Sequence, residues 1–436
     1  MWAWIGYFLL FSIVAFPAAP GLTVFKACLL AFVLVLVAIG VLRGQHTVHN
    51  TLIRWTFFFV MVGFLLILRG LFLATPGAWH LVGVHVLWPV VYLALVSAIA
   101  NVKRIAASER ILILASVFVP IYGFVVIAGT LGLLPGVDQV GLASFQTEQG
   151  VGFSDGYIQL SIHGLSSMSF LMPFTMAILT THHIPKEGCR ISRGWAWLAL
   201  FLGFGLVLVS GRRALQLVTL LAPLLIFGFC TLQPPAERVL AKKFLLKLVL
   251  FGFFCTIALS FVISFMHEVS LKQIFHELAL SFDFSATTAS DSANERRIQF
   301  FALLHGWYEN PIFGAGLGAS AYGSIRSESM PWAYELSYLA LLFQAGVVGL
   351  LTYATGITWI YWMGIRIIRE GSILGRMMLP ILVGLSSFLI ANATNPYLGK
   401  FDGIWPIFLP LAIINYWLVQ RQVPRLAGLS AIQGHG

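Results

Sequence analysis

The sequence is short of charge. Only 10% of its 436 residues are Asp, Glu, Lys or Arg, whereas 59% are hydrophobic, and the mean hydropathy is +0.91. A soluble fold of this length would have far more apolar surface than it could bury. Repeated apolar runs of about 20 residues predict instead a polytopic protein of transmembrane helices.

Cysteine is scarce as well, and this excludes a disulfide framework. The four cysteines lie far apart without a CxxC pair, which also argues against a cysteine-based metal site. The glycine-rich run 314–318 lacks the GK[ST] ending of a nucleotide-binding loop. We therefore expect no metal and no cofactor.

The apolar runs predict an all-α bundle of about twelve spans that forms one integral membrane domain over residues 1–436. We expect the first span to stay uncleaved. The expected spans cover residues 2–18, 21–42, 52–74, 81–100, 111–134, 157–181, 195–210, 213–232, 244–266, 332–363, 377–397 and 404–420.

The net charge of +10 comes from 26 basic and 16 acidic residues. The basic residues gather in alternate connectors, for example in 103–110 and 366–376. That is the positive-inside pattern of a polytopic membrane protein, here with both termini in the cytoplasm. The basic excess is thus a topology signal, and we expect no nucleic-acid partner.

One long connector, residues 267–331, is expected on the outer side of the membrane, where the resemblance described below makes it a periplasmic loop. Residues 267–282 have the periodicity of an interfacial amphipathic helix, and the polar run 285–294 suggests a turn or lid. Residues 295–311 predict a second amphipathic helix that Asn310-Pro311 ends. The glycines of 314–318 then suggest a flexible crossing to the tenth span.

Several arginines fall on the side where the positive-inside rule disfavours them. Arg212 and Arg213 follow Gly211 between the seventh and eighth spans. Arginine suits bidentate contact with phosphate oxygens, although such residues also extend to lipid headgroups or lie on a solvated face. Arg297 is our preferred further phosphate contact. The other outer arginines are Arg69, Arg296 and Arg326.

Glu335 is the acidic residue most suited to chemistry. Ser329–Pro331 predicts a helix start with a serine cap and an early proline, which places Glu335 in the first turns at the membrane–water boundary. A carboxylate there can accept a proton from a sugar hydroxyl, while a salt bridge to an arginine is the alternative interpretation. We expect Tyr338, one turn later, to hydrogen-bond Glu335 or to line a sugar site.

Three stretches resemble the O-antigen polymerase and O-antigen ligase family of bacterial inner membranes. Asn310–Gly316 resembles its NP-apolar-apolar-GxG signature, Tyr338–Gly349 resembles its signature helix, and Ser210–Ala214 resembles its outward arginine segment. The resemblance implies a GT-C-type fold and metal-independent glycosyl transfer from lipid-pyrophosphate-linked sugars. Ligases of the family usually carry His-Asn where this chain has Glu335-Leu336, which looks more like the polymerase branch.

On this resemblance we expect an inverting polymerase of undecaprenyl-pyrophosphate-linked repeat units, with its active site facing the periplasm. Glu335 would be the base, and Arg212 or Arg213, helped by Arg297, would bind the pyrophosphate. The expected partners are the lipid-linked glycan, a glycan acceptor and membrane lipid, with a chain-length regulator as a further one to consider. The alternatives are a ligase that moves glycan to lipid A-core or to protein, and a polysaccharide flippase or transporter.

Overall fold

The protein is an α-helical membrane protein. In the residues that the computed structural model describes, seven helices are long and apolar enough to cross a membrane, and three shorter apolar helices accompany them. This confirms the expected all-α class. The described residues are 2–17, 19–99, 101–130, 132–134, 150–154, 157–181, 192–235, 237–239, 243, 245–250, 252–253, 291–324 and 328–433.

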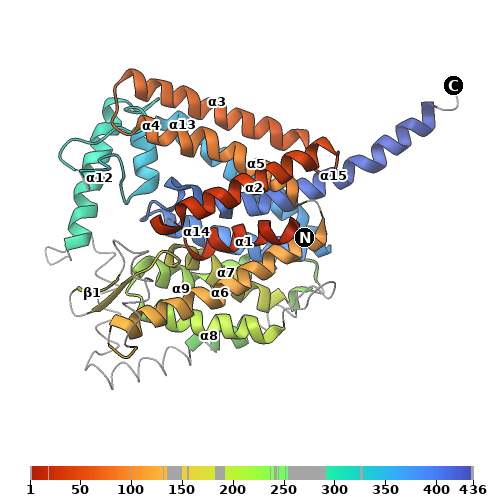
Figure 1. The fold of residues 1–436 in the computed structure, drawn as a ribbon, viewed down its shortest axis with the longest axis horizontal. Helices are drawn as coiled ribbons and strands as arrows, with labels where there is room; N and C mark the ends of the chain where they lie inside the picture. The colour runs from red at the N-terminus through yellow and green to blue at the C-terminus, as the bar shows by residue number, and fades with distance from the viewer. Residues whose placement is uncertain are drawn as a thin grey trace.

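The helices pack side by side into one bundle (Figure 1). The long apolar helices are α2 (Thr23–Leu42), α3 (Asn50–Phe72), α4 (Ala78–Val82) continued by the π-helix η2 (Gly83–Leu87) and α5 (Trp88–Ala98), α6 (Val102–Thr130), α9 (Arg213–Cys230), α13 (Ser337–Arg369) and α14 (Ile373–Asn392). The others are α1 (Trp2–Ala15), α7 (Leu165–Thr181), α8 (Arg193–Val209), α12 (Asp291–Glu309) and α15 (Trp405–Gln433). Short 3-10 helices are η1 (Pro20–Leu22), η3 (Tyr397–Gly399) and η4 (Phe401–Gly403).

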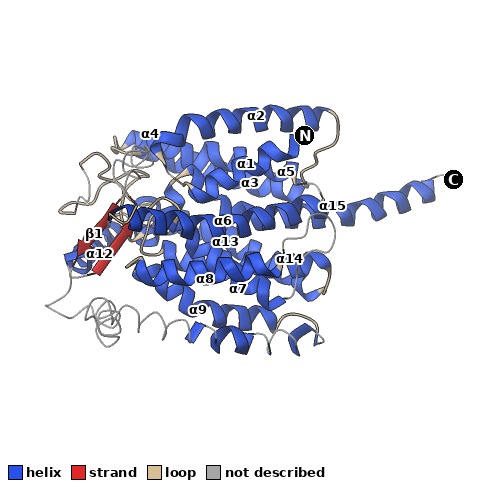
Figure 2. Ribbon diagram, turned by 60° about the horizontal axis from the view of Figure 1, so that its bottom comes forward, coloured by secondary structure: helices blue, strands red, loops and turns tan. Residues whose placement is uncertain are grey.

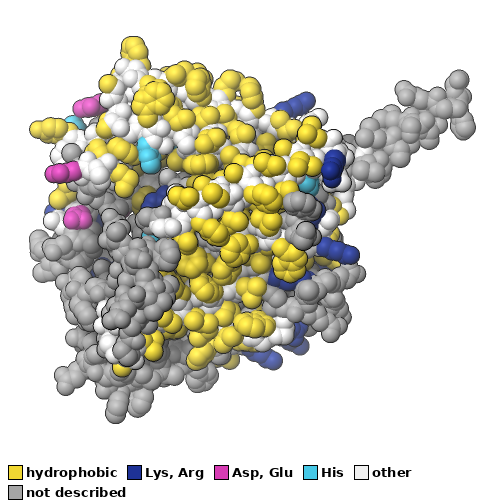
Figure 3. All heavy atoms as spheres, in the orientation of Figure 1, with side chains coloured by type: hydrophobic (Ala, Val, Ile, Leu, Met, Phe, Trp, Pro, Cys, Tyr) yellow, Lys and Arg dark blue, Asp and Glu magenta, His cyan; other side chains and the backbone are white. Residues whose placement is uncertain are grey.

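The two ends of the bundle differ in structure and in charge. Helix α15 leaves the bundle at one end, whereas α12 and the strand β1 (Gly150–Ser154) lie at the opposite end (Figures 1 and 2). On the face shown in Figure 3, most blue Lys and Arg side chains lie at the α15 end, and the magenta Asp and Glu side chains lie at the α12 end. We call these the basic end and the acidic end.

Helix α14 forms the centre of the bundle, where it contacts α7, α9, α13 and α15. It is the most buried of the seven long helices, because its apolar residues cover all sides and a helix of that kind is stable only inside a bundle. Its closest partner is α7, which is also buried along nearly its whole length. The two approach closely where Gly384 lies against Phe170, since an added Cβ would lie 2.8 Å from the ring.

The expected span over residues 157–181 is wrong at its start. Tyr157–Ser161 forms the strand β2, which pairs antiparallel with β1, and α7 begins only at Leu165. The N–H of Leu160 donates to the carbonyl of Ser210 (3.1 Å), in the α8–α9 connection. These hydrogen bonds between distant segments of the chain favour a strand here, although the apolar character of the segment suggested a helix.

Other helix bounds also differ from the expected ones. Helix α6 begins at Val102 rather than near 111, so Lys103 and Arg104 lie in its first turn, where long charged side chains are good helix formers. Helix α14 begins at Ile373, because the Ser372 hydroxyl accepts a hydrogen bond from the N–H of Gly375 (3.2 Å). Most of the expected span 244–266 and all of 267–290 lie outside the described residues, so the count of twelve stays a prediction.

Candidate functional site at the acidic end

Glu335 forms an ion pair with Arg296. The Nε atom of Arg296 lies 2.6 Å from Oε2 of Glu335, and the two side chains are 33% and 17% exposed. The backbone N–H of Glu335 donates to Oε1 of Gln299 (3.1 Å). Arg296 and Gln299 are three positions apart in α12, so one face of that helix holds both the backbone and the carboxylate of Glu335.

Glu335 precedes its helix rather than lying within it. Helix α13 begins at Ser337, and the N-cap residue Leu336 makes no side-chain cap bond. The expected start with a serine cap at Ser329–Pro331 is therefore wrong. The carboxylate is instead held by α12, a partner from another part of the chain, which local sequence signals do not reveal.

Gln344 and Tyr334 hold the irregular segment before α13 in place. The side-chain amide of the buried Gln344 donates to the carbonyls of Ala319 (3.0 Å) and Trp332 (3.1 Å). The Tyr334 hydroxyl accepts a hydrogen bond from the N–H of Ala321. Burial raises the pKa of the Tyr334 phenol, and the bond to Ala321 opposes part of that shift. The backbone around Glu335 is thus anchored by hydrogen bonds from both of its neighbouring segments, and Tyr334 also packs in one buried cluster with Leu303 of α12.

Helix α13 is broken at Gly346. This glycine has φ 65° and ψ −169°, a conformation outside the helical region. Beyond the break, the N–H groups of Val347 and Val348 donate to the carbonyls of Pro311 (3.0 Å) and Ile312 (3.1 Å). The loop after α12 therefore supplies partners that a continuous helix would have supplied itself.

The same loop also satisfies the helix before the break. The N–H groups of Ala315 and Gly316 donate to the carbonyls of Phe343 (2.8 Å) and Gln344 (3.0 Å). Only glycine fits at position 314, because its φ is +70° and a Cβ would lie 2.4 Å from the carbonyl carbon of Gln344. The crossing that we expected to be flexible is thus a tightly hydrogen-bonded insert.

Arg69 fixes this insert from the side of α3. Its Nε and Nη2 atoms both donate to the carbonyl of Gly314 (3.2 and 3.0 Å), and Nη2 also reaches Oδ1 of Asn310 (3.4 Å). We expected Arg69 among the substrate contacts. Its guanidinium is instead directed at the loop, an arrangement that favours a structural role.

Strand β2 (Tyr157–Ser161) holds Arg212, the first arginine of the pair between α8 and α9. Arg212 is the exposed N-cap residue of α9, and it donates from Nε to the Leu160 carbonyl (3.1 Å) and from Nη2 to the Ser161 hydroxyl (3.2 Å). Arg213 is the first residue of α9 and is half-buried. The two neighbours therefore have different surroundings.

Tyr338 and Tyr397 connect this pair with the Glu335 region. The Tyr338 hydroxyl donates to the carbonyl of Leu389 in α14 (2.6 Å), so it does not make the hydrogen bond to Glu335 that we expected as one of its roles. Burial raises the pKa of Tyr397 to about 12, and the positive charge of Arg212 opposes that shift. Tyr338 thus contacts the end of α14, and Tyr397, a few residues beyond that end, lies within electrostatic reach of Arg212.

The structure separates two neighbouring arginines, and the preference for Arg297 as the phosphate contact stays a prediction. Arg296 pairs with Glu335, whereas Arg297 is exposed, because adjacent helix positions point about 100° apart. Arg326 lies outside the described residues. We had not singled out Gln299 or Gln344, although a buried glutamine on an otherwise apolar helix face is a signal of a backbone partner.

No model of a known protein family matches the chain, and no curated protein matches it significantly in sequence.

Proposed function

We propose that the protein is an inverting, metal-independent glycosyltransferase that polymerises undecaprenyl-pyrophosphate-linked oligosaccharide repeat units. The observation that carries this proposal is the ion pair of Arg296 and Glu335, 2.6 Å apart at the acidic end. It joins a cation that suits pyrophosphate to a carboxylate that suits proton transfer from a sugar hydroxyl. Both side chains are partly exposed, so substrate groups have access to them.

The charge of the two ends supports an active site in the periplasm. Cytoplasmic ends of membrane proteins are enriched in Lys and Arg, so the basic end would face the cytoplasm of a bacterial inner membrane. The acidic end, with Glu335, would then face the periplasm, where lipid-linked repeat units are presented. The seven long helices, three shorter ones, α15 and the predicted span 244–266 would together make the twelve spans of a GT-C-like bundle.

In the proposed cycle, the donor substrate releases the base. Phosphate oxygens compete with the Glu335 carboxylate for the Arg296 guanidinium, because pyrophosphate carries more charge and accepts bidentate hydrogen bonds. The Glu335 carboxylate, no longer paired with Arg296, then takes the proton of the acceptor hydroxyl. The oxygen of that acceptor hydroxyl attacks the anomeric carbon from the face opposite the leaving group, which inverts the configuration at that carbon.

The bond from the anomeric carbon to the pyrophosphate oxygen breaks at the same time, and the pyrophosphate leaves with the electron pair. Negative charge therefore grows on the leaving group as the transition state forms. Fixed guanidinium groups therefore stabilise the transition state more than the ground state. Arg296 would act directly, and Arg212 or Arg213 would hold the pyrophosphate or its lipid-proximal part.

The contact between two signature stretches supports the family resemblance behind this proposal. Asn310–Gly316 and the segment around Gly346 each resemble a different signature of the family. The two are joined by backbone hydrogen bonds such as that from Val347 to Pro311 (3.0 Å). Signature residues that meet at one structural feature, in the helix that follows the proposed base, are what a shared site architecture would produce.

The proposal is tested by the substitution Glu335→Gln in purified full-length protein given a defined undecaprenyl-pyrophosphate-linked repeat unit. We expect a folded protein that makes no glycan chains, because the amide cannot accept the proton. The control is Glu309→Gln, an exposed acid of α12, which should polymerise normally. Long chains made by Glu335→Gln would rule out its role as the base.

Glycan length in cells separates this function from the alternatives. Loss of a polymerase leaves single repeat units on the acceptor. Loss of a ligase leaves long lipid-linked chains unattached, and loss of a flippase leaves repeat units in the cytoplasm. Either of the last two outcomes for Glu335→Gln would contradict the polymerase assignment.

A further inference from the structure

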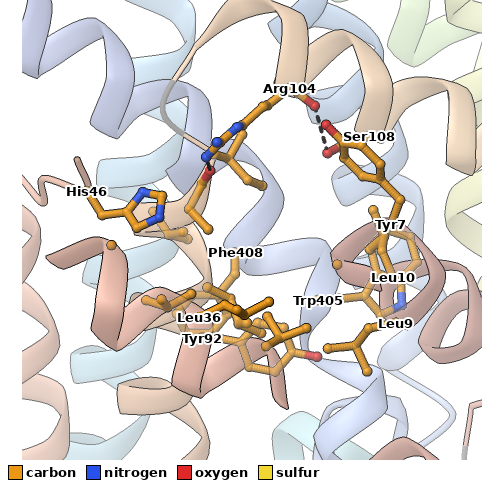
Figure 4. A pocket seen from close by; sticks show the side chains of 18 of the residues that line it. Tyr7, Leu9, Leu10, Leu36, His46, Tyr92, Arg104, Ser108, Trp405 and Phe408 are labelled. Atoms are coloured by element: carbon orange, nitrogen blue, oxygen red, sulfur yellow. Dashed lines mark hydrogen bonds between the residues drawn. The ribbon is translucent and has the colours of Figure 1, made fainter. Parts of the chain in front are cut away.

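A cavity of about 540 Å³ opens toward the basic end of the bundle, away from Glu335. It lies between α1, α2, α5, α6 and the start of α15 (Figure 4). Cavities that bind small molecules and lipids usually measure about 300–1,000 Å³. The volume is therefore sufficient for a ligand, and the proposed glycosyl transfer has no use for it.

The lining of the cavity is strongly one-sided. Its deep part is apolar and aromatic, with residues such as Leu36, Trp405 and Phe408, whereas Arg43, His46 and Arg104 belong to its polar part (Figure 4). No acidic side chain is among the described residues that line it. A cavity of this kind matches an amphiphile with a long apolar chain and a negatively charged head.

The polar part, which we call the mouth, is built rather than incidental. A guanidinium nitrogen of Arg104 donates to the carbonyl of Ala98 at the end of α5, which fixes the side chain. A guanidinium has five N–H groups, and among the groups that the structure describes the others have no hydrogen-bond acceptor, so they can bind an anion. The His46 ring lies against Gly40, where a Cβ would be 1.9 Å from ring atom Cδ2. Its Nδ1 atom is buried and has no hydrogen-bond partner in the described part of the chain.

The mouth is also electropositive. Burial lowers the pKa of His46, and the positive charge of Arg104 lowers it further. An anion placed between these groups would be attracted by the arginines and would stabilise the protonated ring. Arg43 is exposed at the end of α2, next to this position.

We propose that this cavity binds one anionic phospholipid, with its phosphate between Arg43 and Arg104 and an acyl chain in the apolar part. The depth and the apolar lining of the cavity favour a lipid over a soluble anion as its ligand. Ile39 supports the same choice, because it lines the cavity and is also 40% exposed on the outer surface of α2, where membrane lipid would contact it. Basic pockets between transmembrane helices at the cytoplasmic side commonly bind anionic headgroups.

The test is native mass spectrometry of the purified full-length protein titrated with dioleoyl phosphatidylglycerol or dioleoyl phosphatidylcholine. We expect one phosphatidylglycerol molecule to bind at least about tenfold more tightly than phosphatidylcholine. The two lipids share the phosphate, but phosphatidylcholine also carries an ammonium group, which the arginines of the mouth repel. Arg43→Gln and Leu36→Trp should each weaken phosphatidylglycerol binding by about tenfold. The first removes a contact to the lipid headgroup, and the second fills the space of the acyl chain.

The matched control is Arg54→Gln, which removes an exposed arginine of α3 that does not line the cavity. It should bind phosphatidylglycerol like the parent protein. Equal binding of both lipids, or unchanged binding in both cavity variants, would overturn the proposal. If inorganic phosphate alone displaced the bound species as well as phosphatidylglycerol does, the site would be one for a soluble anion and the lipid assignment would be wrong.

Discussion

Gly346 lies against the backbone of Gly314, and Gly314 in turn lies against the backbone of Gln344 and Ala345, just before the break. A Cβ on Gly346 would lie 2.5 Å from the amide nitrogen of Gly314 and 2.2 Å from the carbonyl oxygen of Ile312. The break in α13 and the loop after α12 therefore form one unit, which sets the position of the segment that carries Glu335.

Replacing Gly346 by alanine should disrupt this unit. The substitution combines an unfavourable φ of +65° with a backbone clash at 2.2 Å, and we expect a loss of about 2 kcal/mol or more of stability. Thermal unfolding in detergent measures the effect as a lower Tm. The control Gly228→Ala, where nothing lies within 4 Å of the added Cβ, should leave Tm unchanged or raise it. Equal behaviour of both variants would show that the contact does not limit stability.

Arg69→Ala should loosen the insert without unfolding the protein. The substitution removes both hydrogen bonds to the Gly314 carbonyl, each of which is charge-assisted and worth about 1.5–3 kcal/mol. Hydrogen exchange of the Ala315 and Gly316 amides should become faster, and Arg69→Lys should restore part of the protection. Unchanged exchange rates in Arg69→Ala would show that the backbone hydrogen bonds alone hold the insert in place.

Arg296 and Arg297 should differ sharply in activity. Arg296→Ala removes the ion-pair partner of Glu335, and we expect glycosyl transfer to fall by about 100-fold or more, as for loss of a transition-state contact. Arg297→Ala removes an exposed charge and should keep activity within a factor of about three. Initial rates with the same lipid-linked repeat unit provide the comparison. The reverse ranking would support the preference that the sequence suggested.

Lys26 and Asp402 form a buried ion pair that joins α2 to the segment before α15, with side chains only 7% and 10% exposed. Lys26→Met should cost about 3–5 kcal/mol, because the carboxylate is left buried without its counter-charge. The double variant Lys26→Met/Asp402→Leu should recover most of that loss, which a double-mutant cycle of unfolding free energies measures. Additive losses would mean that the pair contributes little coupling.

Acid should destabilise the start of α3 through His49. The neutral ring caps this helix by accepting a hydrogen bond at Nδ1 from the N–H of Thr51 (3.1 Å), and burial lowers the pKa of His49 below 6.5. This contribution to stability is complete above about pH 6.5 and is lost as the pH falls through the lower folded-state pKa. The substitution His49→Asn keeps a cap acceptor that does not titrate. Its Tm should fall less than that of the parent protein between about pH 7 and about pH 5.

Much of the architecture is predictable from local patterns in the sequence. Apolar runs identify the membrane helices, and the end of α12 at Glu309 agrees with the stop predicted from Asn310-Pro311. The α8–α9 break also falls where Gly211 interrupts the apolar pattern, with φ +63°. Each of these features depends on residues within a few positions of one another, so composition and periodicity carry the information.

The site itself was predicted only in part. The sequence by itself determined that an acid, Glu335, and several arginines lie near one end of an apolar bundle, because burying charge in lipid is costly. Only the tertiary structure decided that Arg296 rather than Arg297 pairs with that acid, and that Arg69 holds a carbonyl 245 positions away. Such pairings depend on how α3, α12 and α13 pack against one another, and packing between distant segments leaves no periodic signal in the chain.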